Sequence, residues 1–166
     1  DHMPAGDPRA WEPIAPSAVA YGAALPRVPR EMTKADIARV RADFVATAKR
    51  ARDVGFEFLL LHFAHGYLID QILWGPTNRR TDKWGETHWL LAREVVAACR
   101  RAVGPGFPIA LRFSQWKQQD YAARLFCRTV RTRGTSFILP IGNQKDGSND
   151  KGRPRYSAQA QGAAPC

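Results

Sequence analysis

Two histidines and a tyrosine stand close together at the end of an apolar run. In FEFLLLHFAHGYLIDQIL (residues 56–73), His62 ends the run, His65 follows three residues later, and Tyr67 comes two residues after that. Each imidazole can donate an N–H to a single electronegative atom, and a phenol with an ordinary pKa near ~10 can supply a proton. These residue types favour a site in which two donors bind an oxygen atom and a third group donates a proton to the same bound molecule.

Spacing alone also allows simpler interpretations. The two histidines would more often be structural loop residues, and Tyr67 would more often be a packed aromatic side chain. Zinc binding through H-x-x-H is a further alternative, but the pattern supplies no third ligand, so no metal is expected. Arg112, taken alone, would be an ordinary arginine near the end of a strand.

The elements that must position these residues follow from the hydrophobic pattern. Residues 56–62 and 107–113 are short, nearly continuous apolar runs, which are typical of strands covered on both faces. Thr33 and Asp36 resemble a capping box at the start of an amphipathic helix that ends at Gly55. A second helix is predicted from about residue 87 to 103, after a polar loop over 63–86.

This alternation of helix and strand predicts an α/β fold with parallel strands, because parallel neighbours need a crossover between them. Residues 33–113 should then form two consecutive α-β units of one sheet. His62 and Arg112 both stand near the carboxyl ends of their strands, where α/β folds keep their chemistry. We therefore expect the two side chains at the same end of the sheet.

The stretch HFAHGYLIDQILWGPTNRRTDKWG (62–85) resembles the old yellow enzyme family, the FMN-dependent NAD(P)H:flavin oxidoreductases. The pattern of that family runs approximately H-x-A-(H/N)-G-Y-L-x-x-Q-F-L-S-P-x-x-N-x-R-x-D-x-Y-G-G. WEPIAPSAV, PREMTKADI and FPIALRFS resemble further family segments in the same order, so the resemblance extends over about residues 10–125. The chain departs from the pattern in LWGP, and in Trp84 where the family usually has Tyr.

The resemblance implies an ene-reductase that uses FMN, with NAD(P)H as reductant and a small activated alkene or similar electrophile as substrate. His62 and His65 match the pair that binds the carbonyl or nitro oxygen of the substrate. Tyr67 matches the residue that protonates the substrate carbon, and Arg112 matches the arginine beside the N1 and O2 edge of the flavin. A catalytically inactive remnant of the family is the alternative. Asn78, Arg79 and Asp82 match the loop pattern, and we expect them to brace that loop.

The resemblance also implies a partial TIM (β/α)8 barrel over residues 1–126, followed by an irregular basic tail over 127–166. A full barrel needs about 250 residues. We therefore expect an incomplete chain, with a tail of unrelated or frame-shifted origin and with weak or no FMN binding by these 166 residues alone. The tail is rich in Gly, Ser, Gln, Asn and Arg, a composition that buries little apolar surface.

Charge and cysteine content bear on partners and compartment. The net charge is +10, and the tail carries half of it, which raises the alternative of a nucleic-acid-binding protein. The tail lacks interleaved aromatic residues, and the remaining charge is scattered, so nucleic acid is the less favoured partner. The three cysteines (Cys99, Cys127 and Cys166) form no recognisable spacing. Without a long apolar run or a signal-peptide pattern, we expect a cytoplasmic protein that does not span a membrane. The pattern does not specify the oligomeric state.

Overall fold

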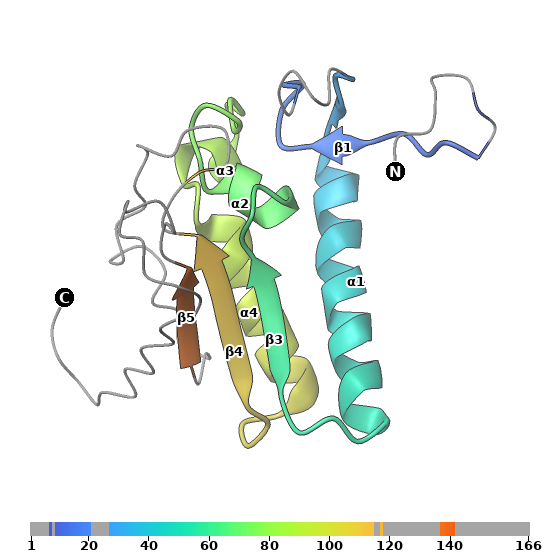
Figure 1. Ribbon diagram of the computed structural model, residues 1–166, viewed down its shortest axis with the longest axis vertical. Coiled ribbons are helices and arrows are strands. Elements are labelled where there is room, and N and C mark those ends of the chain that lie inside the picture. The colour runs from blue at the N-terminus through green and yellow to red at the C-terminus, as the bar shows by residue number, and fades with distance from the viewer. Residues whose placement is uncertain (1–6, 8, 21–26, 115–116, 118–136, 142–166) are drawn as a thin grey trace, which may run out of the picture.

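The computed structural model describes residues 7, 9–20, 27–114, 117 and 137–141 (Figure 1). In chain order the elements are β1 (Ile14–Ala15), β2 (Arg30–Glu31), α1 (Lys34–Asp53), β3 (Leu59–Phe63), α2 (Leu68–Ile72), α3 (Lys83–Glu86), α4 (Leu90–Val103), β4 (Ile109–Ser114) and β5 (Phe137–Ile141). The predicted helices and strands are therefore present, and the region expected as a loop contains the short helices α2 and α3. No helix in the described ranges is both long and apolar enough to cross a membrane.

Helix α1 begins with the predicted capping box. The Thr33 hydroxyl accepts a hydrogen bond from the Asp36 amide at 3.1 Å, and the Asp36 carboxylate accepts one from the Thr33 amide at 2.9 Å. Hydrogen bonds from the Arg30 guanidinium lower the pKa of Asp36 far below its ordinary value, and those from Thr33 add to this effect. The helix ends after Asp53, and Gly55 then adopts a φ of +91°, in the left-handed region that glycine favours.

Strands β3, β4 and β5 form one parallel sheet with β4 in the centre. His62 lies opposite Arg112 in the register of β3 and β4, so the prediction that both stand at the same end of a parallel sheet is confirmed. Strand β5 occupies residues 137–141, inside the segment expected to be irregular, and it pairs with β4 from Ala110 to Ser114. The rest of that segment lies outside the described residues.

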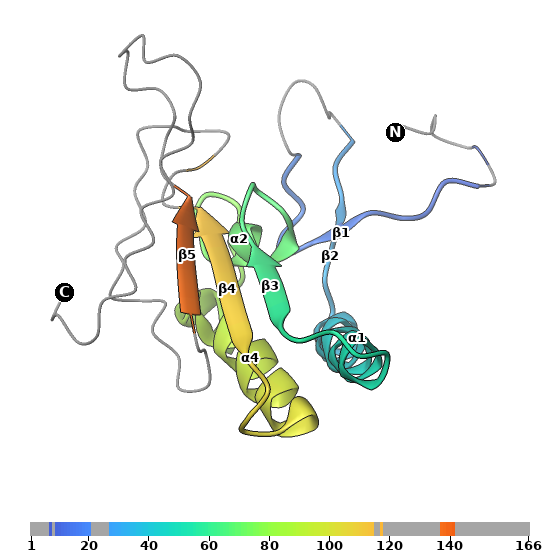
Figure 2. The ribbon, with the colours of Figure 1, turned by 60° about the horizontal axis from the view of Figure 1, so that its bottom comes forward.

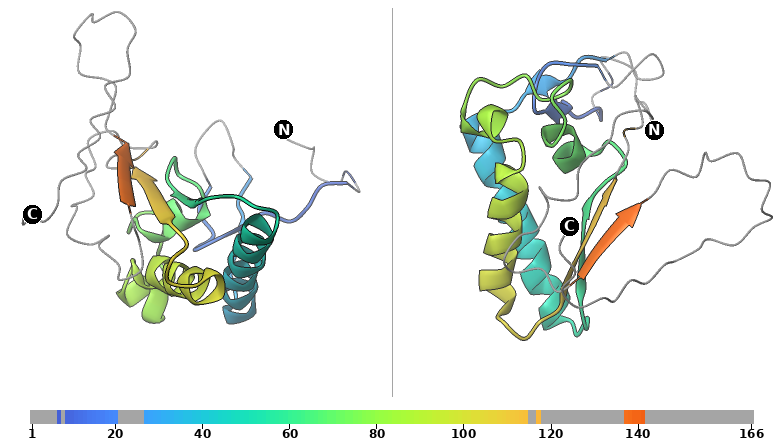
Figure 3. Two further views of the ribbon diagram at one scale, coloured as in Figure 1. Left: turned by 90° about the horizontal axis from the view of Figure 1, so that it is seen from below. Right: turned by 90° about the vertical axis from the view of Figure 1, so that its left-hand side faces the viewer.

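Helices α1 and α4 pack against each other and cover the same face of the sheet (Figures 2 and 3). Leu61 and Phe63 of β3 are buried beneath them, and the Phe63 ring meets the Phe44 ring edge-on at 5.9 Å. Leu60, the residue before Leu61, points to the opposite face of the strand, and it is 42% exposed. In the described part of the chain, helices therefore cover only one face of the parallel sheet, which is the arrangement of a barrel wall with its helices outside.

Candidate active site

The three residues singled out by type and spacing meet at the carboxyl end of β3. The ring centroids of His62 and His65 are 5.1 Å apart, those of His62 and Tyr67 are 5.5 Å apart, and those of His65 and Tyr67 are 6.4 Å apart. His62 comes from the strand, whereas the other two come from the turn that leads into α2. The structure thus places two imidazoles and a phenol around one small volume.

His62 sits on the sheet face that α1 and α4 do not cover. It is two residues from the exposed Leu60, and side chains two residues apart in a strand share a face. Partial burial lowers the pKa of His62, and its neighbours His65 and Arg112 lower it further. The imidazole is therefore neutral near pH 7, with one nitrogen that donates and one that accepts.

The Nδ1 atom of His62 is buried and has no hydrogen-bond partner within the described ranges. A buried polar atom without a partner is costly, and in native proteins such atoms commonly mark a site that a ligand or an ordered water completes. An oxygen of a bound molecule at Nδ1 would remove this cost and would fix the tautomer of the ring. The cluster therefore fits a ligand that carries a hydrogen-bonding oxygen.

Arg112 is the neighbour of His62 on β4, and residues paired in register present their side chains to the same face. It is partly buried, and its positive charge contributes to the lowered pKa of His62. Arg112 thus lies on the sheet face of the cluster. Tyr67, by contrast, is 61% exposed, so its hydroxyl is not sealed from solvent in this conformation.

The turn between His62 and α2 depends on residues that the motif did not identify. His65 has a φ of +62°, the one positive φ of a non-glycine residue in the described ranges. Its amide donates to the Ser114 hydroxyl at 2.9 Å, and the next amide, of Gly66, donates to the Asp70 carboxylate at 2.8 Å. Lys117 pairs with the same carboxylate. A sequence signal for Asp70 exists in its place inside the apolar helix LIDQI, because a charged residue there needs a partner.

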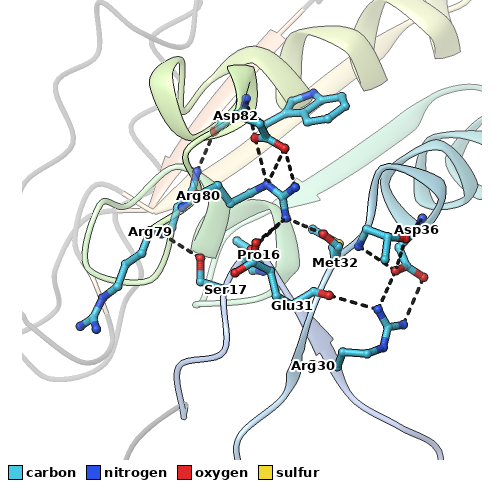
Figure 4. Close-up of polar contacts among 12 residues, drawn as sticks. Pro16, Ser17, Arg30, Glu31, Met32, Asp36, Arg79, Arg80 and Asp82 are labelled. Carbon is cyan, nitrogen blue, oxygen red and sulfur yellow. Dashed lines mark hydrogen bonds and ion pairs between the residues drawn. The ribbon is translucent and has the colours of Figure 1, made fainter.

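The loop brace forms, and Arg80, which was not predicted, contributes more to it than the predicted Arg79. The buried Asn78 side chain donates to the carbonyls of Ile72 and Trp84, both at 2.8 Å, and Asp82 caps α3 by accepting from the Trp84 amide. The guanidinium of Arg79, however, is exposed and meets only the nearby Pro76 carbonyl. Arg80 is the residue that binds Asp82 and reaches across to Pro16 and Met32 (Figure 4).

Neither metal coordination nor thiol chemistry is indicated by the described residues. They contain no group of three or more His, Cys, Asp or Glu side chains that could hold a metal ion. Cys99 is fully buried in α4, and this burial raises the pKa of its thiol to about 11. A thiol in that environment is a poor nucleophile and a poor ligand. Cys127 and Cys166 lie outside the described residues.

The lowered pKa of His62 has a consequence for acid stability. The unfolded chain binds a proton at this imidazole near pH ~6.5, whereas the folded chain binds it only at lower pH. Between these values the unfolded state holds more protons, so the free energy of unfolding decreases as the pH falls below about 6.5. We expect His62→Gln to reduce this loss, measured by urea unfolding from pH 7.5 downward. His88→Gln controls for removing an imidazole elsewhere, and an unchanged pH dependence in His62→Gln would contradict the assignment.

Comparison with known proteins bears on most of the described region, from the N-terminal segment through β4. Residues 6–126 match the NADH:flavin oxidoreductase / NADH oxidase family. An NADH:flavin oxidoreductase of Gibberella zeae is 38% identical over 114 residues, which cover 67% of this chain and 28% of that protein. An NADPH dehydrogenase of Clostridium acetobutylicum is 41% identical over 132 residues, which cover 78% of this chain and 34% of that protein. This chain thus spans about a third of the length of these relatives.

Solved structures agree with this match. Morphinone reductase in complex with tetrahydroNAD superposes with a TM-score of 0.59 at 29% identity, over 63% of this chain and 33% of that one. Old Yellow Enzyme from Pichia sp. superposes with a TM-score of 0.57 at 32% identity, over 62% of this chain and 29% of that one. The resemblance to the old yellow enzymes and the partial α/β barrel expected from it are both confirmed. The chain belongs to the NADH:flavin oxidoreductase / NADH oxidase family.

Proposed function

We propose that the protein acts as an FMN-dependent NAD(P)H oxidoreductase of the ene-reductase type, with a small activated alkene as substrate. The observation that carries the proposal is the cluster of His62, His65 and Tyr67, in which the buried Nδ1 of His62 has no hydrogen-bond partner among the described residues. Bound FMN, once reduced, would supply the hydride, and NAD(P)H would reduce the flavin again. Family membership supports an oxidoreductase that uses flavin, and the cluster supports the finer assignment.

His62 and His65 have the role of binding the carbonyl or nitro oxygen of the substrate. When hydride reaches the β-carbon of an activated alkene, negative charge moves onto this oxygen. Two fixed donors then stabilise the transition state more than the ground state, an effect worth several kcal/mol in comparable sites. A neutral imidazole suits this role, because it donates a hydrogen bond without requiring a full charge to be buried.

Tyr67 has the role of proton donor to the other carbon of the alkene, and Arg112 that of a cation beside the flavin. The phenol of Tyr67 lies beside His62, with their ring centroids 5.5 Å apart. Its exposure allows water to return the proton after each turnover. Arg112 shares the sheet face of His62, where a guanidinium would stabilise negative charge on a reduced flavin. This placement is the basis for assigning the cofactor to that face.

The proposal is tested with the purified protein, added FMN and an α,β-unsaturated ketone. An intact barrel that contains this chain should show a visible flavin absorbance that stays with the protein and ketone-dependent oxidation of NADH or NADPH, whereas these 166 residues alone should bind FMN weakly or not at all. Tyr67→Phe should slow ketone reduction by about 100-fold or more, which is the usual contribution of a positioned general acid. It should leave phenol affinity within about threefold, because the two histidines remain. Unchanged ketone reduction in Tyr67→Phe would remove Tyr67 from the mechanism, and absence of bound flavin from the intact barrel would favour the inactive remnant.

A further inference from the structure

The turn that carries His65 is tied at three backbone groups by side chains from two other elements. Ser114, the last residue of β4, accepts the His65 amide at 2.9 Å, and Asp70 of α2 accepts the Gly66 amide at 2.8 Å. The Gln71 side-chain amide donates to the Gly66 carbonyl at 2.7 Å. The backbone of this turn is therefore held by side chains rather than by backbone hydrogen bonds of a helix or sheet.

Such restraint is needed because His65 adopts a left-handed backbone conformation. A φ of +62° is uncommon for a residue with a Cβ atom, and it persists only when the surroundings impose it. Without these hydrogen bonds the residue would relax toward negative φ, and its ring would leave the position 5.1 Å from the His62 ring. The geometry of the histidine pair thus depends on what holds the turn.

The strongest of these restraints ends in a buried ion pair. Asp70 is 1% exposed and Lys117 is 2% exposed. The Lys117 ammonium pairs with one carboxylate oxygen of Asp70 and lies 3.3 Å from the Asp70 carbonyl oxygen, while the second carboxylate oxygen accepts the Gly66 amide. A buried ion pair seldom stabilises a fold more than apolar residues of the same volume would. Stability alone is therefore a poor reason for these two charges to be here.

We propose that the buried Asp70–Lys117 pair positions the histidine pair: Lys117 holds the Asp70 carboxylate in place, and Asp70 holds the Gly66 amide so that His65 stays beside His62. Asp70 and Lys117 are positioning residues that act through the turn. The link to ligand binding rests on the function proposed above, whereas the link to the turn does not. Loss of the ammonium leaves the buried carboxylate without its partner, so the carboxylate would rotate toward water and its bond to Gly66 would weaken.

Three variants separate the charge of the pair from its hydrogen bond to Gly66. Lys117→Met removes the cation, and Asp70→Ala removes the acceptor. The double variant Asp70→Asn/Lys117→Met is neutral but keeps a side-chain oxygen that can accept the Gly66 amide. The positioning role predicts that both single variants lose the geometry of the turn and that the double variant regains it.

The first readout is independent of the flavin. Only four histidines are present, so their ring protons can be resolved by NMR. We expect a cross-peak between the His62 and His65 rings in the wild type and in the double variant, and its loss in Lys117→Met and Asp70→Ala. Unchanged His88 ring signals would show that a variant is folded. A cross-peak that survives in both folded single variants would overturn the proposal, as would its absence from the folded double variant.

The second readout is the affinity for a phenol, which presents one oxygen to the histidine pair. We expect about tenfold weaker binding in each single variant, as for the loss of one hydrogen bond to a charged acceptor, and recovery in the double variant. If the cross-peak follows the pattern above while phenol affinity never changes, the positioning of the turn stands and the proposed function fails. If substitution of the histidines weakens phenol binding but substitution of Asp70 or Lys117 leaves the cross-peak unchanged, the positioning role fails and the proposed function stands.

Discussion

Replacing His62 or His65 with alanine should weaken the binding of a phenol by about tenfold to 100-fold in each case. A phenolate resembles the enolate formed during alkene reduction, because both carry negative charge on one oxygen next to a planar carbon framework. The two rings lie 5.1 Å apart, close enough to donate to the same oxygen. A hydrogen bond to a charged acceptor contributes about 1.5–3 kcal/mol, which corresponds to this range of affinity.

Titration of the protein with the phenol, followed by calorimetry, measures the effect directly. Because both histidines are expected to contact one oxygen, the double alanine variant should lose less than the sum of the two single effects in free energy, which is the signature of coupled groups. His88→Ala removes an imidazole next to Gly75, away from the cluster, and is the matched control. His62→Gln retains a donor and should bind better than His62→Ala. Phenol affinity that survives both alanine substitutions would refute the donor pair.

The part of the site that could be predicted from sequence is the part carried by local pattern. The apolar runs predicted the positions of β3 and β4, and the helix between the runs predicted that the two strands are parallel. His62 and Arg112 then had to share one end of the sheet, whatever the details of the connection. Phe56 and Phe58 show the limit of this reasoning, because they belong to the same apolar run but precede β3 and are exposed in the structure.

The part that could not be predicted consists of contacts between residues distant in sequence. Asp70 and Lys117 are 47 residues apart, and neither belongs to a recognisable spacing. The left-handed conformation of His65 could not be predicted from sequence either, because only a small fraction of histidines adopt it. It follows from the bonds of Ser114 and Asp70 to the turn, and these form only after β4 and α2 have packed.

Arg80 illustrates how a pattern can locate a function yet assign it to the wrong neighbour. In NRRTD both arginines stand between Asn78 and Asp82, and both have the chemistry of a brace. The backbone decides between them. It directs the Arg80 guanidinium into the structure and leaves that of Arg79 at the surface, while the Arg79 amide donates to the Ser17 hydroxyl at 2.9 Å (Figure 4).

Arg80→Ala should therefore destabilise the fold strongly, whereas Arg79→Ala should not. The Arg80 side chain is 6% exposed, and its guanidinium binds the Asp82 carboxylate, the Met32 carbonyl at 2.5 Å and the Pro16 carbonyl at 3.2 Å. It thus joins the loop before α3 to the two segments that precede α1. Removing it leaves a partly buried carboxylate and two carbonyls without their donor, a loss that costs about 3 kcal/mol in comparable cases.

Urea unfolding of the wild type, Arg80→Ala and Arg79→Ala measures this difference, with Arg79→Ala expected within about 0.5 kcal/mol of the wild type. Arg80→Lys should fall between the two, because an ammonium keeps the charge opposite Asp82 but cannot reproduce the forked geometry that also reaches the two carbonyls. The segment nearby has little freedom to compensate, since a Cβ atom on Gly85 would lie 1.8 Å from the Arg80 carbonyl oxygen. Equal destabilisation by Arg79→Ala and Arg80→Ala would mean that the loop, rather than the Arg80 side chain, holds the N-terminal segments in place.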